Sequence, residues 1–131
     1  MLRSLSFTAF AALGLVMVAG PLLAADPAKE IATAAAHAGL ASGSADLKMV
    51  QTHLHHAINC LVGPAGAGYD GTQANPCKDQ GAGALTDAPT EKKPGLEAAL
   101  TLITDAASET DAVKAKAKAA EAQMALNKLS M

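Results

Sequence analysis

The histidines of this chain are concentrated in one short stretch, and their spacing favours metal binding. Residues 47–62 contain His53, His55 and His56, three of the four histidines in the sequence. On an α-helix, His53 and His56 lie about one turn apart on the same face, and Met49 lies one turn before His53. Imidazole suits copper and zinc, and a thioether favours copper. We therefore predict a transition-metal site on this face, with copper ahead of zinc.

The fourth histidine precedes this stretch. His37 lies in the helical pattern of residues 27–41, and only a short Ser-Gly-Ser turn separates that helix from the next one. Helices joined by so short a turn pack antiparallel as a hairpin. This packing would place His37 opposite the end of the second helix that carries Met49 and His53. His37 is therefore predicted to be an additional ligand. Met49 is predicted to be another, because it lies one turn before His53 on the same helix face.

His55 projects away from the predicted metal-binding face. If the loop after the helix folds back, His55 or His56 would approach Asp70, and the histidine and the carboxylate could act as an acid–base pair. His55 and Asp70 are the pair that we keep as secondary site candidates. The chain has no HExxH motif and no nucleophile elbow, and its carboxylates are scattered. We expect a role in metal sequestration or delivery, and no enzymatic activity.

The two cysteines predict a structural disulfide. Many more residues separate Cys60 from Cys77 than the two that a redox-active pair normally has between its cysteines. Two cysteines in a small exported domain usually form one bridge. Thiolate ligation of a metal is the alternative, and it is disfavoured because exported thiols tend to oxidise.

The N-terminal segment predicts export. Residues 1–25 begin with a single positive charge, Arg3, continue with an apolar run over residues 7–19, and end in small residues. This is the layout of a secretory signal peptide, with cleavage expected after Ala25. A transmembrane anchor is the alternative, because the apolar run approaches spanning length. The Gly-Pro pair after the run favours cleavage, so we expect a periplasmic or secreted protein without stable membrane insertion.

Composition narrows the range of partners. Once residues 1–25 are removed, nine lysines face the 12 acidic residues, and Tyr69 is the only aromatic residue left. Nucleic-acid binding needs a basic surface and, for single strands, aromatic side chains on which bases stack. The sequence therefore excludes nucleic acid and leaves a metal ion or an exported protein as partner.

Helical periodicity predicts the fold class. We expect residues 26–131 to form one all-α domain, a small antiparallel four-helix bundle. A long Gly/Pro-rich loop over residues 63–94, tied by the disulfide, would connect the second and third helices. Ser44 is the expected N-cap of the second helix, and Glu30 is expected on the exposed side of the first. The alanine-rich fourth helix is compatible with a homodimer, because small side chains allow two helices to approach closely. The expected helices lie at about 27–41, 44–62, 95–107 and 110–129.

Two alternative functions remain. The histidines could be the surface flank of a non-catalytic module that binds a protein partner and responds to pH near the ordinary imidazole pKa of about 6.5. Non-covalent haem held by histidine and methionine is the other, and it is disfavoured because the chain lacks the aromatic residues of a haem pocket. A buried His53/His56 face would favour a ligand site, and an open one a partner surface.

Overall fold

The computed structural model describes residues 24–131, which contain five α-helices, one short 3₁₀ helix and no β-strand. This helical content confirms the predicted all-α class. The predicted signal peptide, residues 1–25, lies outside the described part of the chain except for its last two residues. No helix within residues 24–131 combines the length and the apolar character needed to cross a membrane.

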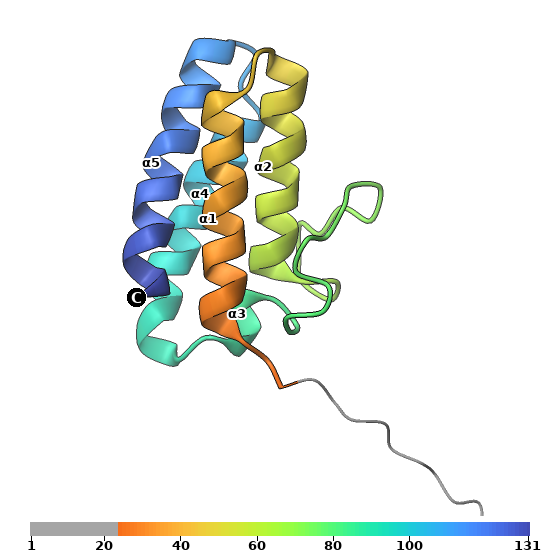
Figure 1. The fold of residues 1–131 in the computed structure, drawn as a ribbon, viewed down its shortest axis with the longest axis vertical. Helices are drawn as coiled ribbons and strands as arrows, with labels where there is room; N and C mark the ends of the chain where they lie inside the picture. Colours follow the sequence, from red (N-terminus) through yellow and green to blue (C-terminus); the bar gives the residue numbers. More distant parts are fainter. Residues whose placement is uncertain (1–23) are drawn as a thin grey trace, which may run out of the picture.

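Four long helices lie side by side, and the chain runs alternately up and down through them (Figure 1). Both α1 and α4 pack against α2 and α5. Short turns join α1 to α2 and α4 to α5, so each pair is antiparallel. The predicted four-helix bundle describes this arrangement only in part, because further helical turns are folded between α2 and α4. The long helices are α1 (Pro27–Gly43), α2 (Leu47–Val62), α4 (Lys93–Ala107) and α5 (Ala112–Ser130).

The start of α2 differs from the prediction. The helix begins at Leu47, because the Asp46 carboxylate accepts a hydrogen bond of 2.9 Å from the Met49 backbone N–H. The prediction that Ser44 caps α2 is wrong. The Ser44 hydroxyl instead donates to the Leu40 carbonyl oxygen and so satisfies the last turn of α1. An ionised carboxylate at the N-cap also complements the positive end of the helix dipole, which favours Asp46 over a serine.

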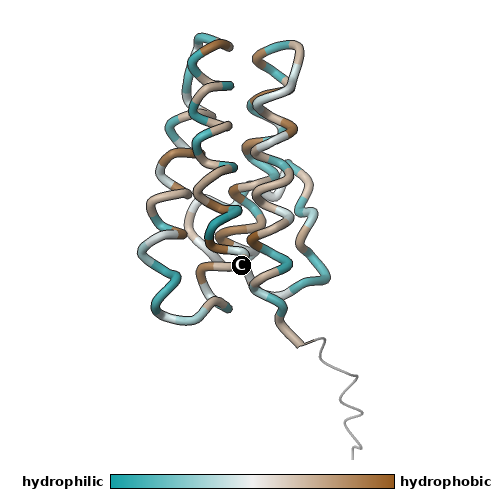
Figure 2. Tube along the Cα trace, turned by 60° about the vertical axis from the view of Figure 1, so that its left-hand side comes forward, coloured by the Kyte–Doolittle hydropathy of each residue, from teal (hydrophilic) through white to brown (hydrophobic). Residues whose placement is uncertain are grey.

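The core is built from small and branched aliphatic side chains. Ile31, Leu54, Leu61, Leu96 and Ile103 are fully buried between the long helices. α5 adds mainly alanines to this core, which allow close approach but contribute little hydrophobic stabilisation each. Brown hydrophobic and teal hydrophilic residues recur along the helical turns of the tube, as an inward and an outward face require (Figure 2).

The segment between α2 and α4 is more structured than the predicted loop over residues 63–94. It contains helix α3 (Ala84–Asp87) and the 3₁₀ helix η1 (Thr90–Lys92). Cys60 and Cys77 form the predicted disulfide, which fixes the middle of this segment to the last turns of α2. The short α3 packs against α1, α2 and α4. The segment therefore covers one end of the helical core.

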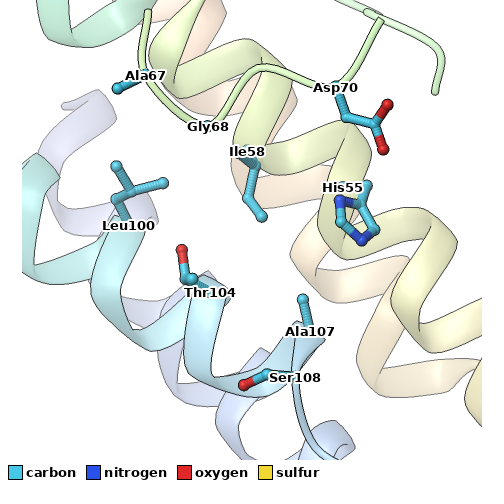
Figure 3. A pocket seen from close by; sticks show the side chains of 9 residues that line it. All are labelled: His55, Ile58, Ala67, Gly68, Asp70, Leu100, Thr104, Ala107 and Ser108. Carbon is cyan, nitrogen blue, oxygen red and sulfur yellow. The ribbon is translucent and has the colours of Figure 1, made fainter. Parts of the chain in front are cut away.

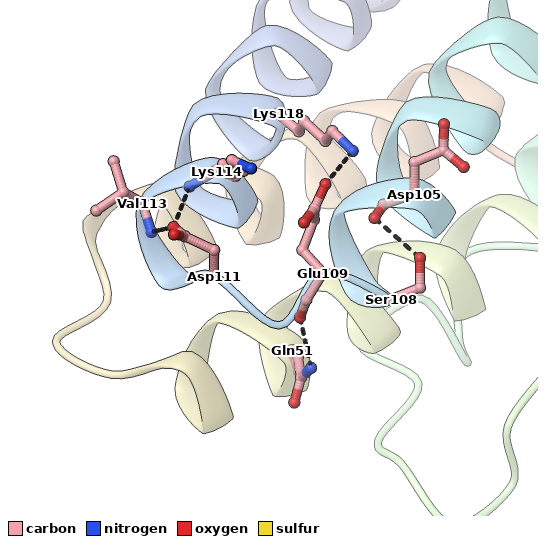
Figure 4. A network of polar contacts seen from close by, with 8 residues as sticks. All are labelled: Gln51, Asp105, Ser108, Glu109, Asp111, Val113, Lys114 and Lys118. Carbon is pink, nitrogen blue, oxygen red and sulfur yellow. Dashed lines mark hydrogen bonds and ion pairs between the residues drawn. The ribbon is translucent and has the colours of Figure 1, made fainter.

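Polar contacts fix the connection between α4 and α5 (Figure 4). The side-chain amide of Gln51 on α2 donates to the carbonyl oxygens of Ala107 and Glu109. Glu109 also forms an ion pair with Lys118. Asp111 caps α5 by accepting from the first N–H groups of that helix. These contacts tie the turn to α2, the helix that carries most of the histidines.

Candidate metal centre

Three histidines meet between α1 and α2. His37 projects from α1, and His53 and His56 project from α2 one turn apart. One nitrogen from each imidazole lies within 4.8 Å of the other two, and all three side chains are half-buried. The three ring centroids are 5.2 to 5.8 Å apart. The antiparallel hairpin therefore brings His37 to the face of α2 that carries His53 and His56.

The spacing of two of these nitrogens matches that of two ligands on one ion. The Nδ1 atoms of His37 and His53 are 3.4 Å apart. Nitrogens that lie about 2.0–2.1 Å from a tetrahedral metal ion are roughly 3.3–3.4 Å from each other. A direct hydrogen bond would be weak at this distance, because such bonds are usually about 2.7–3.2 Å long. The geometry is thus better suited to a shared ion than to a shared proton.

Burial keeps two of the imidazoles in the form that binds metals. It lowers the pKa of His37 to about 4, and the neighbouring His56 and His53 lower this pKa further. Burial also lowers the pKa of His56, with smaller contributions from His53 and His55. A neutral imidazole has a nitrogen lone pair available for coordination, whereas an imidazolium does not. The cluster therefore offers ligands that need not lose a proton at neutral pH.

One edge of the His56 ring lacks a hydrogen-bond partner within the described residues. Its Nδ1 atom is buried and makes no hydrogen bond with any part of residues 24–131. Buried polar atoms without a partner are uncommon in folded proteins, and each calls for a physical explanation. Coordination of an ion among the three imidazoles would supply a partner for this atom, provided that His56 turns its Nδ1 edge toward His37 and His53.

The remaining predicted ligand lies at the edge of the cluster. Met49 precedes His53 by one turn of α2, and its side chain is 45 % exposed. Its role as a ligand stays a prediction.

His55 and Asp70 lie together on a different side of α2. Both line a pocket of about 310 Å³ between α2, the following loop and α4 (Figure 3). The loop does fold back over α2, because the Asn59 side chain bonds to both the N–H and the carbonyl oxygen of Asp70. The two secondary candidates are therefore neighbours, but they do not belong to the three-histidine cluster.

Sequence reasoning missed one unusual side chain. Glu30 was expected to be exposed, yet it is fully buried beneath residues 81–87. Its Oε1 atom accepts a hydrogen bond from the Gly83 N–H, while its Oε2 atom is buried without a partner. Burial raises the pKa of Glu30 to about 7 against the opposing Gly83 N–H, and the nearby Asp87 and Asp26 raise it further. Helical periodicity could not reveal this, because the covering segment has no period.

Comparison with known proteins gives no further guide to the site. No family model, no curated protein and no solved structure matches this chain. Its function must therefore be argued from the residues themselves.

Proposed function

We propose that this protein binds one transition-metal ion through His37, His53 and His56, with copper ahead of zinc. The separation of 3.4 Å between the Nδ1 atoms of His37 and His53 is the observation that carries the proposal. The neutral state of buried imidazoles and the unpartnered Nδ1 of His56 support it. Three imidazoles leave a fourth coordination position, which Met49 or an incoming ligand would fill.

The proposed role is sequestration or delivery of the metal in an exported compartment. The sequence pattern of residues 1–25 and the disulfide both favour export. Expression of the complete chain in a bacterium, followed by mass spectrometry of the periplasmic protein, tests this part. We expect a mature chain that begins at Asp26 and contains the oxidised cysteine pair. Retention of residues 1–25 on a membrane-bound protein would contradict it.

Calorimetric titration of the oxidised protein tests the metal site. We expect binding of copper(I), copper(II) or zinc with micromolar or tighter affinity and one ion per chain. The double variant His53→Ala/His56→Ala should lose this binding. The variant His55→Ala is the matched control, because it removes a histidine from the same helix outside the cluster, and its affinity should be unchanged.

The identity of the metal can be tested separately. A thioether is a soft ligand, so Met49→Leu should weaken copper(I) binding and leave zinc binding unchanged if Met49 completes the site. Absence of binding for all three ions, or equal binding by the double variant, would refute the metal site. The histidines would then be better explained as part of a surface for an exported protein partner.

A further inference from the structure

A pocket lies on a different side of α2 from the histidine cluster, and none of the three clustered histidines lines it. The pocket that contains His55 and Asp70 has a volume of about 310 Å³. Pockets for small organic ligands begin at roughly this size, with a range of about 300–1,000 Å³. α2, α4 and the loop at residues 67–70 each supply one wall (Figure 3). The pocket is thus large enough for a compact molecule of a few heavy atoms.

The pocket has an apolar interior and polar groups near its opening. The side chains of Ile58 and Leu100 point into the space between the walls (Figure 3). The exposed hydroxyl-bearing residues Thr104 and Ser108 lie along the α4 side. Asp70 lies beside His55 at the outer edge of the opening, and its carboxylate is directed outward (Figure 3). A ligand that fits would therefore place hydrocarbon inward and a polar group toward the opening.

The acidic group at the edge of the opening is a single carboxylate beside His55. Asp70 is the one carboxylate among the lining residues, and no lysine or arginine lines the pocket. Hydrogen bonds from the hydroxyl and the N–H of Thr72 to Oδ1 lower the pKa of Asp70, so it is ionised at neutral pH. Among the hydrogen bonds of residues 24–131, none involves Asp70 Oδ2. One carboxylate oxygen is therefore available to a cationic donor.

The loop that carries Asp70 is held in place before any ligand arrives. The amide of Asn59, a fully buried residue, donates to the Asp70 carbonyl oxygen, and its oxygen accepts from the Asp70 N–H, both at 2.9 Å. The adjacent Cys60 is joined to Cys77, which anchors the far end of the same loop. A carboxylate fixed in this way loses little conformational entropy when a ligand binds.

We propose that this pocket binds a small organic amine, whose ammonium group pairs with Asp70 and whose short hydrocarbon body packs against Ile58 and Leu100. The volume of the pocket is sufficient for a branched chain of a few carbons. The charge of its single carboxylate selects a cation over a neutral alcohol and rejects a carboxylic acid.

The test is an NMR titration of the metal-free, oxidised protein with three probes of the same shape: 3-methylbutylamine, 3-methylbutanol and 3-methylbutanoate. We expect saturable shifts of the Ile58, Gly68 and Leu100 amides with the amine at millimolar concentrations. The alcohol should bind about two- to fivefold more weakly, because ion pairs near a surface contribute modestly. The acid should not bind.

The variant Asp70→Asn should weaken amine binding to the level of the alcohol. Its side-chain oxygen can still accept the bonds from Thr72, so the loop should keep its fold. The variant Asp79→Asn is the matched control, because it removes an exposed carboxylate of the same loop outside the pocket, and it should bind like the unchanged protein. Equal binding of amine and alcohol, or full amine binding by Asp70→Asn, would overturn the proposal.

The outcome is separable from that of the metal site. The double variant His53→Ala/His56→Ala should keep its amine binding, since neither side chain lines the pocket. Loss of amine binding in that variant would show that the pocket is not an independent site.

Discussion

The first helix carries two titratable side chains, the fully buried Glu30 and the half-buried His37, and the difference between them separates two regions of the molecule. Glu30 lies at the start of α1 beneath residues 81–87, and His37 lies two turns later against α2. Burial favours the neutral form of both, since it raises the pKa of Glu30 to about 7 and lowers that of His37 to about 4. Glu30 becomes neutral by keeping a proton, whereas His37 does so by releasing one.

This difference decides what each region can do. A neutral carboxyl group is a poor ligand for a cation. Ionised carboxylates that lie close together repel one another. Neutral imidazoles do not repel in this way and present lone pairs to an ion. The protonation of Glu30 is therefore linked to the stability of the fold, whereas the histidines around His37 could hold a metal ion.

Removal of the disulfide should have the largest effect on stability, and it should leave the region around His37 unchanged. The Cys77 Sγ atom lies 3.8 Å from the Glu30 carbonyl oxygen, so the bridge holds the cover over this end of α1. We expect Cys60→Ser/Cys77→Ser to lower the free energy of unfolding by about 3 kcal/mol, by the loop-closure argument. Urea denaturation followed by circular dichroism measures the change. Metal affinity should stay within about threefold, and a parallel loss would show that the two regions are coupled.

Removal of one proposed ligand should have the next largest effect, and it should act on the three-histidine cluster alone. His37→Ala deletes the contribution of α1 to the cluster, so we expect metal affinity to fall by about 100-fold or more, which is roughly 2.7 kcal/mol. Competition with a chromophoric chelator measures this loss. The pH dependence attributed to Glu30 should persist in the variant. Unchanged affinity in His37→Ala would mean that α1 contributes no ligand.

The pH dependence of the free energy of unfolding should distinguish Glu30 from His37. The folded protein holds the Glu30 proton up to about pH 7, and the unfolded chain releases it near the ordinary value of 4.5. Between these values the folded state binds more protons, so this group makes stability fall as pH rises, and the full deficit remains above pH 7. His37 acts in the opposite sense, because its folded pKa is about 4 and its ordinary value is 6.5. Its contribution rises with pH across that interval.

The variant Glu30→Gln isolates the first of these contributions. A glutamine can still accept from the Gly83 N–H but does not ionise. We expect the variant to be more stable than the unchanged protein above pH 7 by about 2 kcal/mol, a value reduced from the full pKa shift to allow for relaxation. The two proteins should differ much less below pH 4.5. Denaturation at pH 4, 6 and 8 measures the difference, and a constant difference across this range would contradict the assignment.

The start of α2 gives the smallest expected effect. Asp46→Ala removes the N-cap of the helix that carries His53 and His56, which should cost about 1 kcal/mol of stability. Ser44→Ala removes only an exposed hydroxyl bond at the end of α1 and should cost less than about 0.5 kcal/mol. Thermal melting of the two variants compares them. The reverse order would restore Ser44 as the cap.

Much of the three-histidine cluster could be predicted, because it depends on local geometry. The spacing of His53 and His56 places them on one face of any helix, and a short turn after α1 forces an antiparallel hairpin. The contact of His37 with His53 followed from these two facts. The pairing of Cys60 with Cys77 was predicted from their number and from the expected export of the chain. Each of these predictions depends on residues that are close in sequence, or on two cysteines that have no other cysteine to pair with.

The amino-acid sequence by itself determined the helical class, the disulfide pair and the shared face of His53 and His56, since these follow from periodicity and composition. Only the tertiary structure decided that Glu30 is buried and that His55 and Asp70 line a separate pocket. The reason is the segment between α2 and α4, which has no repeating pattern to reveal what it covers. Its position is set by contacts such as Gly83 to Glu30 and Asn59 to Asp70, which join residues through space.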